Sequence, residues 1–271
     1  GATEIIVMDE AFHGRTLASV NASGNPNYRE PFGPLDGFSH VPFNDVGAVR
    51  DAIGPQTAAI LVEPLQGEGG VNVADEGYLV ALRQICDEHN LLLMLDEVQT
   101  GIGRTGKLFA WQHENVQPDV MALAKGLGSG VPIGAIVANE RGDILEPGDH
   151  GTTFGGQPFT TSVALETLRV IIEEDIPAQA AARGEQLTSG IRALEDRHPL
   201  IDHVRGKGLL VAVQLSEDVG PALVAAIRER GLICNVVKPN VLRLVPPLTI
   251  SEDEINDAIG IIDDALASIA E

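Results

Sequence analysis

The chain has 271 residues, of which 44% are hydrophobic, so it can bury a sizeable core in one large domain or two ordinary ones. Its formal net charge of −21 disfavours nucleic acid as a partner, because a strongly acidic surface repels phosphates. No apolar run approaches the ~20 residues that span a bilayer, and the first residues lack the basic and apolar regions of a secretory signal. We therefore expect a cytoplasmic protein that binds neither nucleic acid nor membrane.

The 39 acidic residues are spread along the chain, and 14 of the 18 basic residues are arginine. This balance is typical of proteins from salt-loving organisms, because high salt screens the repulsion within an acidic surface. The two cysteines, Cys86 and Cys234, are too few and too far apart for a disulfide framework or a metal cluster. The seven histidines show no paired metal-ligand spacing, so we expect no metal site and mostly surface histidines.

The first two thirds of the chain alternate apolar runs with helical patterns. Five runs are predicted to form buried strands: residues 4–8, 58–63, 91–97, 119–124 and 134–138. Between the second and the third, residues 75–90 carry apolar side chains at helical spacing, with Asp75 as the expected N-cap. This order of strands and helices predicts an α/β domain with a mainly parallel sheet.

After residue 158 the pattern changes to consecutive helices and a second set of apolar segments. Helices are predicted over 160–174, 178–197, about 220–230 and 251–270, with apolar segments at 208–215, 231–236 and 241–250. Ser251 followed by Glu254 fits a capping box at the start of the last helix. We expect a large α/β domain over residues 1–178 and a smaller α+β domain over residues 179–271. Because the chain opens directly on an apolar strand, we also expect that a preceding segment is absent from it.

Two neighbouring strands are predicted to end in charged residues. The run 91–97 ends in Asp96 and Glu97, and the next run is followed by Lys125. The carboxyl edge of an open α/β sheet is where ligands bind. One interpretation of Asp96 is a helix cap or an ion pair with Arg104, and Lys125 could extend into solvent toward an acid. The other is a partly desolvated lysine of the kind that bonds covalently to carbonyl groups. The spacing alone leaves both open.

Three long motifs decide between these interpretations by resemblance. They read LLLMLDEVQTGIGRTG (91–106), ALAKGLGSGVPIGA (122–135) and HGTTFGGQP (150–158). Together with FHGRT (12–16), VEPLQGEGGV (62–71), VRGKGLL (204–210) and LRLVPPLTI (242–250), they resemble the class III (ornithine-type) pyridoxal-phosphate aminotransferases. The similarity runs over the full chain in order. It implies the fold-type I architecture, a large domain with a mainly parallel sheet plus a smaller C-terminal α+β domain, and pyridoxal 5′-phosphate as cofactor.

The resemblance implies a role for each matching residue around the cofactor. Lys125 would bind the cofactor aldehyde and move the proton during transfer, and Asp96 would pair with the pyridine nitrogen. Val98 and Phe12 would pack on the two faces of the ring. Gln99 would hydrogen-bond near the phenolic oxygen.

Four further matches imply substrate binding and assembly. Thr153 would reach the cofactor phosphate of a neighbouring subunit, which implies a homodimer with shared active sites. Arg243 would hold the substrate α-carboxylate through its planar fork, and Glu68 would pair with that arginine until the other substrate arrives. Arg15 would contact the distal carboxylate.

Within the family the motifs look most like the acetylornithine branch. The implied reaction moves the terminal amine of N-acetylornithine, an ω-amino donor, to 2-oxoglutarate in arginine biosynthesis. Ornithine, acetyl-lysine-type, succinylornithine and 4-aminobutyrate aminotransferases stay open as alternatives. So do an aminomutase, a non-catalytic interaction module and an inactive truncated fragment. The family's small-residue phosphate-binding turn has no counterpart in this sequence.

Overall fold

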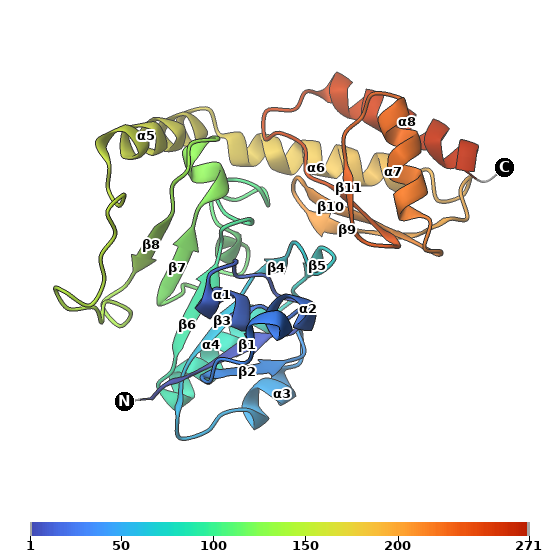
Figure 1. Ribbon diagram of the computed structural model, residues 1–271. Coiled ribbons are helices and arrows are strands. Elements are labelled where there is room, and N and C mark those ends of the chain that lie inside the picture. Colours follow the sequence, from blue (N-terminus) through green and yellow to red (C-terminus); the bar gives the residue numbers. More distant parts are fainter. Residues whose placement is uncertain (1, 270–271) are drawn as a thin grey trace. The chain divides into compact units, whose positions relative to one another are not determined.

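The computed structural model describes residues 2–269, and the chain divides into two compact units (Figure 1). The first contains residues up to Pro64, Ala74–Ile102 and Phe109–Glu174. The second contains Leu65–Val73, Gly103–Leu108 and the residues from Asp175 onward. The predicted boundary after residue 178 thus lies close to the observed change at 174/175. The two short inner segments of the second unit were not predicted.

The first unit is built on a six-stranded sheet in the order β2-β1-β3-β6-β7-β8. Its strands are β1 (Glu4–Met8), β2 (Phe38–Val41), β3 (Thr57–Val62), β6 (Leu92–Asp96), β7 (Val120–Leu123) and β8 (Ala135–Ala138). All neighbours pair in parallel except β7 and β8, which are antiparallel. The sheet is therefore mainly parallel, as predicted, with an antiparallel strand at one edge.

The helices of the first unit are α1 (Leu17–Ala22), α2 (Pro26–Arg29), α3 (Val46–Asp51), α4 (Tyr78–His89) and α5 (Pro158–Glu173). Helix α4 packs on β3 and β6 and buries its Leu79, Leu82 and Ile85 in the main core. The prediction that Asp75 caps this helix was wrong. Gly77 is the N-cap, at a φ of +82°, because the chain enters the helix through a left-handed turn that glycine adopts without strain.

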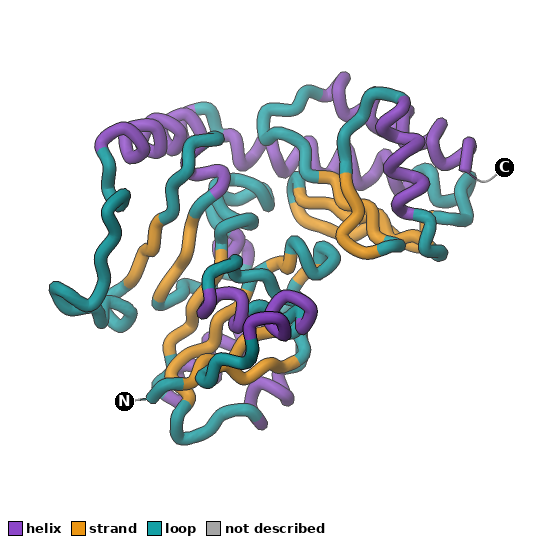
Figure 2. Tube along the Cα trace, in the orientation of Figure 1, coloured by secondary structure: helices purple, strands orange, loops and turns teal. Residues whose placement is uncertain are grey.

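The second unit has a four-stranded antiparallel sheet in the order β11-β12-β10-β9. Its strands are β9 (Ile201–Lys207), β10 (Leu210–Leu215), β11 (Asn235–Lys238) and β12 (Val241–Leu244). Helices α6 (Ile176–Arg192), α7 (Gly220–Glu229) and α8 (Glu252–Ile269) lie together on one face of this sheet (Figures 1 and 2). The hairpin of β4 (Leu65–Gln66) and β5 (Asn72–Val73) belongs to the same unit.

Two features of the second unit follow directly from its sequence. The capping box is confirmed: Ser251 N donates to Glu254 Oε2 at 2.8 Å, and Glu254 N donates to Ser251 Oγ at 3.2 Å. The end of α8 predicted at residue 270 lies outside the described residues. Gly184 lets α6 approach the backbone of Gly208 so closely that a Cβ atom would lie 2.2 Å from the Gly208 oxygen.

Several elements were not predicted. They are the helices α1, α2 and α3, the strands β2, β4, β5 and β9, and the 3₁₀ turns Glu30–Phe32, Ala110–His113 and Lys125–Gly128. No helix among residues 2–269 is long and apolar enough to cross a membrane.

Candidate active site

Asp96 lies at the carboxyl edge of the first unit's sheet, as the last residue of β6. It is 8% exposed. His13 Nδ1 donates to its Oδ2 at 2.8 Å, and the Val98 N–H donates to its Oδ1 at 3.0 Å. His13 follows β1 in the chain, so the parallel order of β1, β3 and β6 brings its side chain to the same edge. A buried carboxylate with two donors is thereby fixed in orientation.

His13 is an exception to the expectation that the histidines are mostly on the surface. Its side chain is only 3% exposed, and His198 is also buried. Asp96 uses neither of the partners proposed for it. It does not cap a helix, and Arg104 in the second unit donates instead to the carbonyls of Leu209 and Pro246, at 3.0 and 2.6 Å. Burial lowers the pKa of that arginine to about 10.

Glu97 has a structural role that separates it from its neighbour Asp96. It is fully buried and accepts from Thr100 Oγ1 and from the N–H groups of Ala110 and Trp111, at 2.8 to 2.9 Å. Burial raises the pKa of this carboxyl, although these three donors oppose the shift. Glu97 therefore holds the turn at 110–113 in place.

Phe12 is anchored at the same edge through its backbone. Its N–H donates to Glu63 Oε1 at 2.7 Å, and Glu63, which directly follows β3, is buried. The ring of Phe12 meets that of Tyr28 edge to face, with centroids 6.0 Å apart. The guanidinium carbon of Arg15 lies 3.9 Å from the Tyr28 ring centroid and 5.2 Å from that of Phe12.

Lys125 follows β7, the strand paired with β6, and begins a short 3₁₀ turn. The pairing of Asp96 with Ala122 places the acid and the lysine at adjacent strand ends, as predicted. Its φ is +40°, a left-handed conformation that is uncommon for a lysine and that often marks functional positions. Lys125 is exposed rather than partly desolvated, and most of residues 129–138, which follow it in the chain, are exposed as well.

Two buried polar atoms, in residues that follow or contact Asp96, indicate whether a cofactor fits at this edge. Gln99 Oε1 and His13 Nε2 are buried and have no hydrogen-bond partner within the protein. Buried polar atoms are normally satisfied, so these atoms fit a polar ligand at this edge. Val98 and Gln99 follow Asp96 directly, and both are partly buried. Asp96, Gln99 and Lys125 therefore fit pyridoxal phosphate. Among residues 2–269 no group of three or more potential ligands could hold a metal ion.

The second unit contains the predicted pair of Arg243 and Glu68. Arg243 Nη1 lies 2.6 Å from Glu68 Oε1 and 3.3 Å from the Gly67 oxygen. Arg243 stands on β12, and Glu68 lies in the turn between β4 and β5. Thr153 belongs to the first unit, where it is exposed in a turn between β8 and α5. The predicted site residues therefore divide between the two units.

Sequence reasoning did not assign His13 and Tyr28, although both belong to this edge of the first unit. His13 lies inside the FHGRT motif, so its position in that motif was the available signal. Tyr28 had none, because its contact with Arg15 depends on the loop that joins α1 and α2.

Comparison with known proteins agrees with this geometry. The family model "Aminotransferase class-III" matches residues 1–266. An acetylornithine aminotransferase from Mycolicibacterium smegmatis is 48% identical over 273 residues, covering all of this chain and 70% of that protein. Ornithine aminotransferase 2 from Staphylococcus saprophyticus is 46% identical, covering 94% of this chain and 65% of that protein.

Solved structures show the same likeness. The ornithine aminotransferase of Toxoplasma gondii superposes with a TM-score of 0.95 at 37% identity, covering 99% of this chain and 66% of that one. Acetylornithine aminotransferase from Elizabethkingia anophelis gives a TM-score of 0.85 at 37% identity, covering 98% and 66%. The chain thus spans about two thirds of the length of these relatives. It belongs to the class III aminotransferases, a family of transaminases whose cofactor is pyridoxal phosphate.

Proposed function

We propose that the protein transfers the terminal amino group of N-acetylornithine to 2-oxoglutarate, a step of arginine biosynthesis in the cytoplasm. The observation that carries the proposal is the placement of Asp96 and Lys125 at adjacent strand ends of one sheet. The choice of donor rests on relatives named acetylornithine aminotransferase at 44–48% identity. Ornithine is the second candidate, because relatives named for it are 45–46% identical.

Pyridoxal phosphate, when bound, supplies an electron sink that stabilises a carbanion next to the transferred nitrogen. Asp96 would hold a proton on the pyridine nitrogen, and His13 fixes the carboxylate that does so. Lys125 Nζ would hold the cofactor aldehyde and then, as base and acid, move a proton from the amine-bearing carbon of the substrate to the aldehyde carbon of the cofactor. Phe12 and Val98 would pack on the ring faces, and Gln99 would donate or accept near the phenolic oxygen.

In the second unit, Glu68 would control access to Arg243. While Glu68 occupies the guanidinium, as it does at 2.6 Å, the site carries no uncompensated cation. A substrate carboxylate that binds Arg243 bidentately would take the place of Glu68. If the Glu68 carboxylate and a substrate carboxylate exchange at Arg243, the protein could bind N-acetylornithine, which has one carboxylate, and then 2-oxoglutarate, which has two.

A homodimer with shared sites is part of the proposal. The first unit exposes large apolar side chains on β8, on α5 and in the segment between them. They are Ile136, Val137, Ile144, Leu145, Phe154, Phe159, Leu165 and Ile172. A concentration of exposed apolar side chains in one part of the chain favours an interface, and Thr153 lies within the same segment. Sedimentation velocity tests this: a purely monomeric protein over the micromolar range would contradict it.

Covalent trapping tests the cofactor assignment. The chain has four lysines, at 107, 125, 207 and 238, so three serve as internal controls. After incubation with pyridoxal phosphate and borohydride, peptide mass spectrometry should find the pyridoxyl group on Lys125. Lys125→Arg should abolish this label. Equal labelling of all four lysines would reject the assignment.

Steady-state rates with a panel of donors test the substrate. N-acetylornithine should give the highest kcat/KM, ahead of ornithine, acetyl-lysine-type donors and 4-aminobutyrate. A wide margin for 4-aminobutyrate would overturn the choice of donor. Specific labelling of Lys125 without any turnover would favour the alternative, a fragment that binds cofactor but lacks activity.

A further inference from the structure

The guanidinium of Arg15 rests on aromatic rings rather than on a carboxylate. Its carbon lies 3.9 Å from the Tyr28 centroid, well within the range of a cation–π contact, and 5.2 Å from that of Phe12. No ion pair of Arg15 with an acid occurs among residues 2–269, whereas Arg50 pairs with Glu88 at 2.7 Å.

This way of holding the arginine leaves its hydrogen-bonding edge available. A guanidinium held over a ring is attracted through its positive charge, so its N–H groups can still bind a planar carboxylate. A carboxylate partner would instead occupy those donors, as Glu68 does at Arg243. The aromatic contact therefore restrains Arg15 without neutralising it.

The backbone brings Tyr28 to this position through a close approach of two loops. Gly24 N donates to the Ala11 oxygen at 2.8 Å, and a Cβ atom on Gly24 would lie 2.2 Å from the nitrogen of Glu10. Only glycine allows this contact between the loop after α1 and the chain after β1. Asn25 then caps α2 by accepting from Asn27 N at 3.0 Å, and that turn presents Tyr28 to Arg15.

We propose that Tyr28 is a positioning residue that sets the affinity for dicarboxylate substrates by holding the Arg15 guanidinium over its ring. The inference rests on the proposed function and on the role that the family resemblance implies for Arg15, which is contact with the distal carboxylate of the substrate. Phe12 touches both Tyr28 and Arg15, so the same aromatic pair also links the arginine to the residue expected to pack on the cofactor ring.

The first experiment observes the contact itself. In ¹H–¹⁵N NMR spectra of the protein, the side-chain resonances of Arg15, assigned by their loss in Arg15→Lys, should show the shift that a neighbouring ring current causes. Tyr28→Phe should keep this shift and Tyr28→Leu should abolish it. A shift that is unchanged in Tyr28→Leu would overturn the inference.

The second experiment measures the consequence, using glutarate, a dicarboxylate that the reaction leaves unchanged. By calorimetry on the cofactor-loaded protein, Tyr28→Leu should raise the Kd for glutarate by about fivefold, the effect of a typical exposed cation–π contact. Tyr28→Phe should restore the affinity. Phe32→Leu is the matched control, because Phe32 is an exposed aromatic residue four positions away and should not change the Kd.

The outcomes separate the inference from the proposed function. If Arg15→Lys weakens glutarate binding and Tyr28→Leu does not, the positioning role is wrong and the proposed function stands. If neither Arg15→Lys nor Tyr28→Leu changes the Kd, the role of Arg15 in the proposed function is wrong, and the inference falls with it.

Discussion

His13 hydrogen-bonds the buried carboxylate of Asp96, and a single substitution tests what this contact contributes. Its Nδ1 lies 2.8 Å from Asp96 Oδ2, and its side chain is 3% exposed. His13→Ala leaves a buried carboxylate with only the Val98 N–H as a donor. We expect a loss of about 2–3 kcal/mol in the free energy of unfolding, because a buried charged acceptor loses its partner. We also expect a weaker affinity for pyridoxal phosphate.

His198 offers the matched control for this variant. It is buried in the second unit and pairs with Asp263 at 2.6 Å, so His198→Ala removes a comparable contact. Urea denaturation should show that both variants lose stability. Only His13→Ala should weaken the binding of pyridoxal phosphate in an absorbance titration. Equal cofactor affinities in the two variants would mean that His13 has no role at the site beyond folding.

At the scale of single residues, the order and spacing of the sequence motifs predicted more of the site than the expected burial of side chains did. The ordered motifs pointed to Asp96 and Lys125, and the parallel register places both at one edge. His13 was not singled out because its burial depends on pairing between β1, β3 and β6, which are far apart in sequence. The exposure of Lys125 agrees with the interpretation that its side chain extends into solvent, but the spacing alone did not decide between that interpretation and a partly desolvated lysine.

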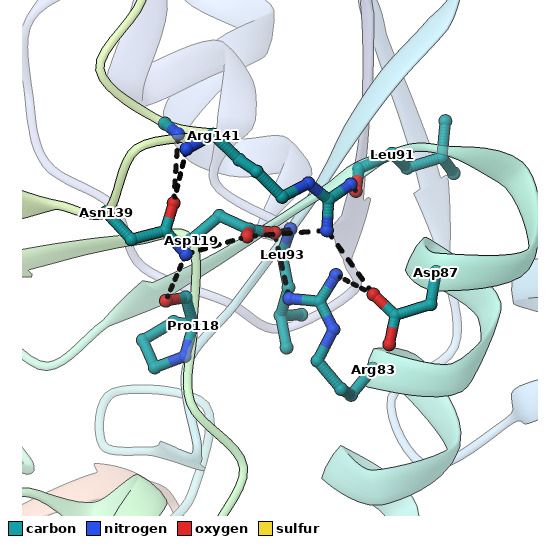
Figure 3. Close-up of polar contacts among 9 residues, drawn as sticks. Arg83, Asp87, Leu91, Leu93, Pro118, Asp119, Asn139 and Arg141 are labelled. Carbon is teal, nitrogen blue, oxygen red and sulfur yellow. Dashed lines mark hydrogen bonds and ion pairs between the residues drawn. The ribbon is translucent and has the colours of Figure 1, made fainter.

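At the scale of elements, a charged network around Asp119 joins α4, β6, β7 and the turn after β8 (Figure 3). Asp119 is 2% exposed and accepts from Arg83 Nη1 at 2.8 Å, from Leu93 N at 2.9 Å and from Asn139 Nδ2 at 3.0 Å. Arg141 Nη1 lies 3.5 Å from Asp119 Oδ1. The network lies at the amino ends of β6 and β7, the opposite end of these strands from Asp96.

The pH dependence of stability follows from this network. Burial alone would raise the pKa of the Asp119 carboxyl, but the hydrogen bonds from Leu93, Asn139 and Arg83 outweigh it and hold the pKa below its usual 3.8. The folded state therefore binds this proton less readily than the unfolded state. Its stabilising contribution is complete above pH 3.8 and is lost as the pH falls through the lower pKa of the folded protein.

Asp119→Asn should accordingly lower the free energy of unfolding at pH 7 by about 3 kcal/mol, because Arg83 loses its buried partner. The difference from the wild-type protein should shrink at pH 3. Asp87→Asn serves as the control, since Asp87 pairs with Arg83 on the surface and is 59% exposed. Urea denaturation at both pH values measures this, and a difference that does not depend on pH would contradict the assignment.

Predicted elements succeeded where apolar periodicity is strong and failed where the structure depends on turns. The five runs of the first unit all form strands, with ends shifted by at most one residue. Strand β2 was missed because its four residues are only partly apolar, and pairing with β1 stabilises it. The segment predicted at 231–236 forms strand only at 235–238, because Gly231 adopts a φ of +92° and the chain turns there.

At the scale of the molecule, the division of the chain could not be read from linear order. Residues 65–73 and 103–108 belong to the second unit although they lie within the first in sequence. Hydrogen bonds to residues far along the chain hold both segments there. Arg205 donates to the Gly70 oxygen at 2.6 Å, and Leu209 N donates to the Arg104 oxygen at 3.0 Å. The local composition of these two segments does not indicate that they belong to the second unit.

The net charge of −21 yields the last prediction, which concerns the whole chain. Uniform negative charge destabilises a compact state by self-repulsion, and salt shortens the range of that repulsion from about 10 Å at 0.1 M to about 3 Å at 1 M. We therefore expect the midpoint of urea denaturation to rise as KCl is increased across this range. Sorbitol at equal osmolality should have a smaller effect, because it does not screen charge.

A variant with fewer surface acids distinguishes screening from other effects of salt. Glu229, Asp257 and Asp264 are exposed on α7 and α8, and replacing them by Gln or Asn changes the net charge from −21 to −18. The variant should be more stable than the wild-type protein at low salt and should gain less from KCl, because less repulsion remains to be screened. If the wild-type midpoint does not change with KCl, self-repulsion does not limit the stability of this fold, and the acidic composition needs another explanation.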